Sequence, residues 1–196
     1  MIMQNLELAE GTLGVDEPAS DLLERLRAGE PRAVGTAYDQ HHHAVRAFAR
    51  RLLGDASVAE DLVHDVFVRL PKAASNFRGD SSLRTFLISI AVNRARHFVR
   101  AATRQRAAVE RMAREPHPHS EDPEQHLGRR QLADALARAL SALPLEQRVA
   151  FVLCEVEQRS SIEVAGIVDA PEGTVRTRLY HARRKLREAL AAEGLA

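Results

Sequence analysis

The chain has 196 residues, a formal net charge of +1 and a hydrophobic fraction of 45%. This length allows one large domain or two small ones, and the hydrophobic content excludes wholesale disorder. Ala, Leu, Arg and Glu predominate, aromatic residues make up only 4%, and alternating β-branched runs of strand length are missing from the sequence. Because this composition favours helix almost everywhere, we expect an all-α fold.

Acidic and basic residues are segregated along the chain. Residues 1–31 are acidic, whereas residues 78–114 and 172–187 are rich in arginine. Two basic stretches in a nearly neutral chain indicate two contacts with a polyanion, and the acidic parts indicate a basic protein surface as partner. Charge alone leaves one alternative open, in which these stretches are simply solvated helix faces.

The sequence also indicates the compartment. A single cysteine, Cys154, excludes an internal disulfide, and its place in the apolar run 151–154 predicts a buried structural thiol. The first residues lack the basic start and apolar core of a secretion signal, and no stretch approaches the length of a membrane-spanning helix. We therefore expect a cytoplasmic protein that does not insert into a membrane.

The first half of the chain has the pattern of a helical domain. Helices are expected over residues 21–28 and 31–52. Ser57 and Glu60 have the spacing of a capping box, in which both side chains satisfy backbone N–H groups at a helix start, and Pro71 is expected to end that helix. A polar turn then precedes a helix with a basic face opposite an apolar stripe.

Proline and acidic residues divide the chain into two domains. Residues 115–126 carry three prolines and four acids, a composition that favours a flexible linker. We expect an acidic disordered leader over residues 1–19, an N-terminal domain over 20–114 and a C-terminal domain over 127–196.

The C-terminal domain has the signature of a helix-turn-helix. A short helix is expected after Ser160, which has capping-box spacing to Glu163, and the turn 169–171 leads to a strongly basic second helix. This pattern predicts a DNA-binding module, with a plain helical hairpin as the alternative. The residues opposite the apolar stripe of the second helix, which are able to meet a major groove, are Arg176, Thr177, Tyr180, His181 and Arg184.

Neither a metal site nor an enzyme active site is expected. The histidines at positions 41–43, 117 and 119 suggest metal binding, but consecutive histidines on a helix point in different directions and no cysteine or carboxylate set completes a ligand cluster. No nucleophile with a neighbouring base, glycine-rich phosphate loop or paired-carboxylate motif can be picked out either. We expect no cofactor and no catalytic activity.

Three blocks in the sequence resemble one family. Residues 61–70 (DLVHDVFVRL) look like its polymerase-docking stretch, residues 77–93 (FRGDSSLRTFLISIAVN) like its promoter-melting and −10-reading segment, and residues 143–179 like its −35-reading domain. The blocks occur in the family's order and cover nearly all of residues 20–190. The sequence therefore resembles the extracytoplasmic-function RNA polymerase sigma factors, group IV of the sigma-70 family.

The resemblance implies that the chain binds core RNA polymerase, at the largest-subunit clamp and the flap, and directs promoter recognition, DNA melting and transcription initiation. An anti-sigma factor is expected as a further partner. The polymerase contacts would be Asp61, Asp65, Phe67 and Arg69. The −10 contacts would be Arg78, Asp80, Ser81, Ser82, Arg84, Phe86, Asn93, Arg96 and Arg100. The −35 contacts would be Arg176, Thr177, Arg178, Tyr180, His181, Arg183 and Arg184.

Two other classes of protein share some of these features. A free-standing transcriptional regulator would bind DNA as a dimer through the same helix-turn-helix, but residues 20–115 do not look like a dimerisation or receiver domain. A sigma mimic that titrates an anti-sigma factor would not need the basic −10 face, which this chain retains.

Overall fold

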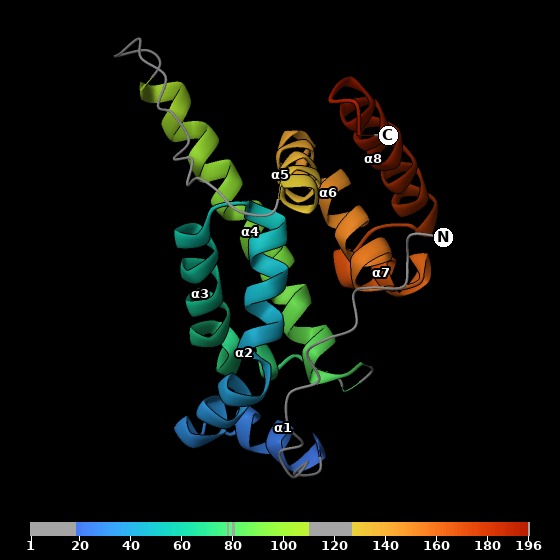
Figure 1. Ribbon diagram of the computed structural model, residues 1–196. Coiled ribbons are helices and arrows are strands. Elements are labelled where there is room, and N and C mark those ends of the chain that lie inside the picture. Colours follow the sequence, from blue (N-terminus) through green and yellow to red (C-terminus); the bar gives the residue numbers. More distant parts are fainter. Residues whose placement is uncertain (1–18, 78, 80, 110–126, 196) are drawn as a thin grey trace.

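The computed structural model describes residues 19–77, 79, 81–109 and 127–195. These residues form helices and no strand (Figure 1), which confirms the all-α prediction. The expected linker lies wholly, and the expected leader almost wholly, outside the described residues. The elements are α1 (Ala19–Arg27), α2 (Pro31–Leu53), α3 (Ala56–Ala74), α4 (Leu83–Val109), α5 (Leu127–Ala142), α6 (Leu145–Phe151), the π-helix η1 (Val152–Val156), α7 (Ser161–Val168) and α8 (Glu172–Ala192).

Helices α1 to α4 form a bundle at the N-terminal side of the molecule (Figure 1). Their apolar stripes meet in one core, in which Phe48 of α2, Leu62 of α3 and Leu87 of α4 are fully buried. This burial is the main stabilising term, because a fully buried Leu or Phe side chain contributes about 1.5–3 kcal/mol.

Helix α3 begins two residues earlier than the capping-box prediction required. Asp55 is the N-cap, and its Oδ1 accepts a hydrogen bond from the backbone N–H of Val58 at 3.0 Å. The predicted box of Ser57 and Glu60 is wrong because Ser57 already lies inside the helix, where its side chain is beyond the free N–H groups of the first turn. Glu60 instead accepts hydrogen bonds from Arg46 at 3.0 Å and Arg50 at 3.3 Å.

The prediction that Pro71 ends α3 is also wrong. The helix continues through Pro71 to Ala74. Proline removes one backbone hydrogen bond, but Leu70 and Ala74 on either side are fully buried, and their packing holds the last turn in helical form.

Helices α5 to α8 and η1 form the C-terminal half. Helix α5 and the turn after it pack on α8, where Ala139, Leu143, Ala182 and Leu186 are buried together in a small core. None of the helices that the structure describes is both long and apolar enough to cross a membrane.

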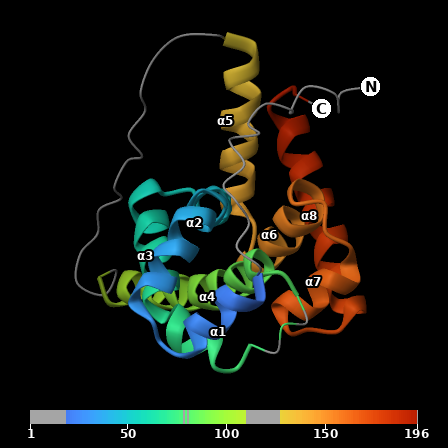
Figure 2. The ribbon, with the colours of Figure 1, turned by 90° about the horizontal axis from the view of Figure 1, so that it is seen from below.

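The two halves are packed against each other. Helix α4 contacts α6 and α7, and α2 contacts α5, α6 and η1 (Figure 2). Val149, Leu153 and Ile167 of the C-terminal half belong to the same apolar cluster as Leu52 and Leu87 of the N-terminal half. The sequence predicted two helical halves, but it gave no indication of this contact.

Candidate nucleic-acid interface

The helix-turn-helix consists of α7 and α8. The capping box predicted at the start of α7 is confirmed: Ser160 Oγ accepts from the backbone N–H of Glu163 at 3.2 Å, and Glu163 Oε2 accepts from the backbone N–H of Ser160 at 2.9 Å. The hydrogen bond from this N–H is the main reason that the pKa of Glu163 lies below its usual value. Asp169 ends α7 in the left-handed conformation, with φ of 51°, and so turns the chain towards α8.

Helix α8 is anchored through one face and exposes the opposite one. Its buried residues are Val175, Ala182 and Leu186. Arg176, Thr177 and Arg184 are exposed, and so is Tyr180, at 63%. His181 is partly buried and lies edge-on to Tyr180, with ring centroids 5.5 Å apart. The outward direction predicted for these five residues is thus found for four of them, and His181 lies at the margin.

Two further arginines of α8 pair with carboxylates on neighbouring elements. Arg178, which is partly buried, forms an ion pair with Glu146 of α6 at 3.1 Å, and the exposed Arg183 forms one with Glu155 of η1.

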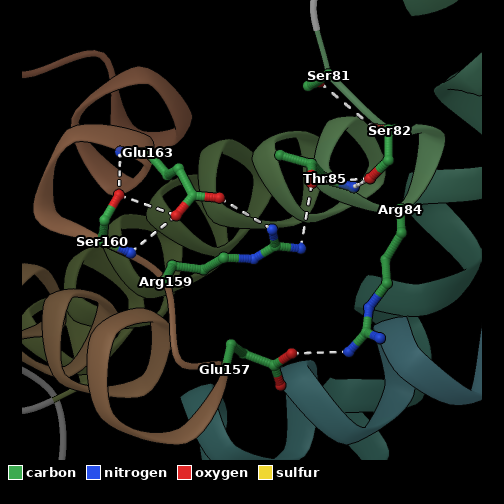
Figure 3. Close-up of polar contacts among 8 residues, drawn as sticks. All are labelled: Ser81, Ser82, Arg84, Thr85, Glu157, Arg159, Ser160 and Glu163. Carbon is green, nitrogen blue, oxygen red and sulfur yellow. Dashed lines mark hydrogen bonds and ion pairs between the residues drawn. The ribbon is translucent and has the colours of Figure 1, made fainter.

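The start of α4 is the second candidate contact. Ser82 caps the helix, because its Oγ accepts from the backbone N–H of Thr85 at 3.2 Å and lies 2.9 Å from Thr85 Oγ1. Ser81 is exposed beside it (Figure 3). Arg78 and Asp80, which belong to the predicted −10 contacts, lie outside the described residues.

Phe86 lines a cavity of about 680 Å³ between the start of α4 and α7. Its ring stacks on Phe77, with centroids 4.3 Å apart and an interplanar angle of 19°. Ser81 and Ser82 line the same cavity, and Ile162 of α7, which is 71% exposed, lines it too. Phe77, Phe86, Ser81 and Ser82 thus line one side of an open hollow, and residues of α7 line its other side.

The basic face of α4 is directed partly towards the C-terminal half. Arg84 donates to Glu157 at 2.8 Å (Figure 3). Arg96 donates to both carboxylate oxygens of Glu146, at 2.9 and 3.0 Å, and also to the side-chain oxygen of Asn93 at 3.0 Å. Of the predicted −10 contacts on α4, Asn93 and Arg100 are exposed, and the charge of Arg100 helps to lower the pKa of Glu146.

Helix α3 carries the predicted polymerase contacts in two different environments. Asp61 is exposed, whereas Asp65 accepts hydrogen bonds from Arg69 at 2.8 Å and from Arg94 of α4. Burial works to raise the pKa of Asp65, but the two arginines outweigh it and hold that pKa below its usual value. Phe67 is only 4% exposed and makes an edge contact with Tyr38, so its ring is part of the core.

Sequence reasoning missed four residues that organise these surfaces. Glu146, Glu157 and Arg94 form the ion pairs described above. Arg148 donates to the backbone carbonyls of Leu52 at 2.6 Å and Leu143 at 3.0 Å, and burial lowers its pKa. No signal in the sequence distinguishes Glu146 and Glu157 from the seven other acids of residues 127–196.

The histidine run on α2 is built into ring contacts. His42 stacks on Tyr38, with centroids 4.6 Å apart, and its ring also lies 3.8 Å from that of His43. Within the described parts of the chain, His, Cys, Asp and Glu side chains form no group of three that could hold a metal ion.

Comparison with protein families matches both halves of the chain. Residues 37–105 match the family model of sigma-70 region 2, and residues 133–186 match that of sigma-70 region 4. Together the two matches cover more than half of the sequence.

Known proteins and structures agree with this assignment. The chain is 30% identical to the RNA polymerase sigma-H factor of Pseudomonas aeruginosa, over 89% of this chain and 94% of that protein. It is 30% identical to the ECF RNA polymerase sigma-E factor of Escherichia coli K12, over 84% and 90%.

Two solved structures are similar in fold. The sigma factor RpoE of Bartonella quintana, in complex with the anti-sigma factor NepR, matches with a TM-score of 0.64 and 25% identity over 80% of this chain and 96% of that one. CnrH, in complex with the cytosolic domain of CnrY, matches with a TM-score of 0.62 and 25% identity over 89% and 97%. The chain belongs to the extracytoplasmic-function sigma factors of the sigma-70 family.

Proposed function

We propose that this sigma factor reads the −35 element with the exposed face of α8 and the −10 element with the start and basic face of α4. The observation that carries the proposal is the anchoring of α8 through Val175, Ala182 and Leu186, which leaves Arg176 and its neighbours directed outward. An arginine held in this way is able to pair with both acceptors of a guanine in the major groove.

The −35 contacts divide into two kinds. Arg176, Thr177, Tyr180, His181 and Arg184 are candidates for base or backbone contact on the outward face. Arg178 and Arg183 are candidates for phosphate contact, because a guanidinium that pairs with a carboxylate can also pair with a phosphate.

At the −10 element the contacts would be to melted single-stranded DNA. A base removed from its stack costs a few kcal/mol, which a pocket and phosphate contacts must compensate. Ser81, Ser82 and Phe86 of the N-terminal half form one wall of the cavity and are candidates for base contact, and Asp80 is a further candidate. Arg78, Arg84, Asn93, Arg96 and Arg100 are the candidates for holding the strand.

The polymerase contact would use the exposed side of α3. Asp61 and Arg69 are exposed on it. Asp65 and Phe67 would act mainly by holding α3 in place, since one is bound to two arginines and the other is buried. The contact sites on the polymerase would be the largest-subunit clamp and the flap, as the resemblance implies.

An anti-sigma factor is proposed as a regulatory partner. The solved RpoE structure is a complex with the anti-sigma factor NepR, and the solved CnrH structure is a complex with the cytosolic domain of CnrY. We further propose that the chain acts in the cytoplasm without catalysing a reaction, and that residues 1–19 are a leader and 115–126 a linker between functional domains 20–114 and 127–196.

A gel-shift titration tests this division of labour. The free protein is expected to bind promoter duplex weakly and without sequence preference, and to become specific after addition of core polymerase, because only polymerase would set the two basic surfaces at the spacing of the −35 and −10 elements. Sequence-specific binding at nanomolar concentration without polymerase would contradict the proposal and favour a free-standing regulator. A duplex with scrambled −35 and −10 elements is the control.

A further inference from the structure

The contact between the two halves is made by charged groups around an apolar centre. Glu157, at the end of η1, accepts from Arg51 of α2 at 2.9 Å and from Arg84 of α4 at 2.8 Å. Arg159, two residues further on, donates to Thr85 Oγ1 at 3.3 Å (Figure 3). One short segment of the C-terminal half thus binds the first turn of α4 and the end of α2.

Glu146 of α6 is a second glutamate that binds an arginine of the N-terminal half. It binds Arg96 of α4 through both carboxylate oxygens and also pairs with Arg178 of α8. Arg96 donates in addition to the backbone carbonyl of Val168, at the end of α7, at 3.1 Å. Glu146 therefore joins one arginine proposed for the −10 strand to one proposed for the −35 duplex.

The two glutamates occupy these arginines in the way that phosphates would. A planar guanidinium binds a carboxylate and a phosphate through the same kind of N–H···O hydrogen bond, so a glutamate competes with a phosphate for these donors. Arg96 gives Nε and Nη2 to Glu146, whereas Arg84 gives only Nη2 to Glu157 and remains exposed. Arg84 and Arg96 thus have an internal anion where the proposed function requires a DNA strand.

We propose that Glu146 and Glu157 form a carboxylate latch that closes the two domains of the free sigma factor on each other and masks Arg84 and Arg96 from DNA. The latch rests on the proposed −10 role of these arginines. The apolar contact of Val149, Leu153 and Ile167 with the N-terminal half favours the closed form. In that form the two glutamates are the anions bound to Arg84 and Arg96. Opening, with exchange of carboxylate for phosphate, then accompanies assembly with polymerase and promoter.

The double variant Glu146→Gln with Glu157→Gln tests the latch in the full-length chain. Glutamine keeps the size and the hydrogen-bond acceptor but removes the charge. The matched control is Asp39→Asn with Glu193→Gln, which removes two carboxylates outside the interface, one exposed on α2 and one paired with Arg138 beside the end of α8. Both variants raise the net charge equally, so a general electrostatic effect on DNA binding appears in both.

Two readouts are needed: the radius of gyration by small-angle X-ray scattering, and the affinity for a fluorescein-labelled single-stranded oligonucleotide by fluorescence anisotropy. For the latch variant we expect a larger radius and an affinity about tenfold higher than that of the control, the size that the loss of a few half-exposed ion pairs allows. Circular dichroism confirms that each variant remains helical.

An unchanged radius, with the same DNA affinity as the control, would overturn the latch without affecting the proposed promoter contacts, which polymerase-dependent binding tests separately. A larger radius without tighter DNA binding would also overturn the proposal. In that case Arg84 and Arg96 would not be DNA contacts, and the failure would lie in the proposed −10 site.

Discussion

Asp65 of α3 and Arg94 of α4, 29 residues apart in the sequence, form an ion pair that ties the two helices together while Asp65 also binds Arg69 on its own helix. Asp65 is therefore a structural residue as well as a candidate polymerase contact, and it differs in this from the exposed Asp61, one turn earlier.

Charge reversal is expected to affect polymerase binding at Asp61 and protein stability at Asp65. Asp61→Lys is expected to weaken binding to core polymerase and to change the free energy of unfolding by less than about 0.5 kcal/mol, because it alters an exposed side chain. Asp65→Lys is expected to cost at least about 1 kcal/mol of stability, since it leaves Arg94 without its acceptor next to a new positive charge.

Pull-down of core polymerase and urea unfolding measure the two effects. Equal stability of the two variants would contradict the structural role of Asp65. Unchanged polymerase affinity of Asp61→Lys would mean that the exposed side of α3 is not the contact surface.

The start of α3 provides a test of local structure. Asp55→Ala removes the side chain that accepts from Val58, and it is expected to lower the free energy of unfolding by about 1 kcal/mol. Ser57→Ala changes an exposed residue within the first turn and should cost less than about 0.5 kcal/mol. Thermal unfolding measures the loss of stability in each variant. A larger loss for Ser57→Ala than for Asp55→Ala would contradict Asp55 as the N-cap and support the capping box of Ser57 and Glu60.

Substitutions on α8 are expected to have two kinds of effect, one from the loss of base contacts and one from the loss of phosphate contacts. Arg176→Ala and His181→Ala are expected to change which −35 sequences support transcription, because a lost base contact removes about 1–3 kcal/mol of discrimination. Arg187→Ala is expected to weaken all promoters alike and to reduce the salt dependence, as a phosphate contact would. Transcription from a pool randomised at the −35 element measures both. A uniform loss in all three variants would contradict base recognition by this face.

Acid is expected to weaken the contact between the two halves through Glu146. The hydrogen bond from Arg96 is the main cause that lowers its pKa from the ordinary 4.5, the charges of Arg96, Arg178 and Arg100 add to it, and burial opposes it. A carboxyl whose pKa is lowered on folding stabilises the folded form above its unfolded pKa and loses this contribution as pH falls through the folded value.

The stability of the wild type should therefore fall more than that of Glu146→Gln as pH is lowered from about 5 to about 3, by up to about 1 kcal/mol. Urea unfolding at a series of pH values measures the difference. Glu30, Asp65 and Glu163 also have lowered pKa values, but they titrate in both proteins and cancel. Parallel pH profiles would contradict the contribution of Glu146.

Local signals in the sequence predicted the helices and the helix-turn-helix well. The box of Ser160 and Glu163, and the apolar spacing of Val175, Ala182 and Leu186, act within a few residues, so the pattern is sufficient. The same kind of signal failed at Ser57, because Asp55 offered an acceptor two residues earlier, and at Pro71, because tertiary packing continued the helix.

Helix caps and apolar spacing could not predict the contact between the two halves. The bonds of Arg84 to Glu157 and of Arg96 to Glu146 span 73 and 50 residues, and both arginines looked like ordinary members of a basic stretch. Which arginines face DNA and which face a glutamate depends on how two helical surfaces dock, and hydrophobic spacing does not encode that choice.

Run-off transcription with purified core polymerase, on a library of promoters randomised at both elements, tests the central claim most directly. We expect that adding this protein yields transcripts from templates that share one −35 and one −10 sequence. We also expect Asp61→Lys to reduce all of these transcripts and Arg176→Ala to alter only the −35 preference. Transcription that is independent of the added protein, or activity without any shared −10 sequence, would contradict the account.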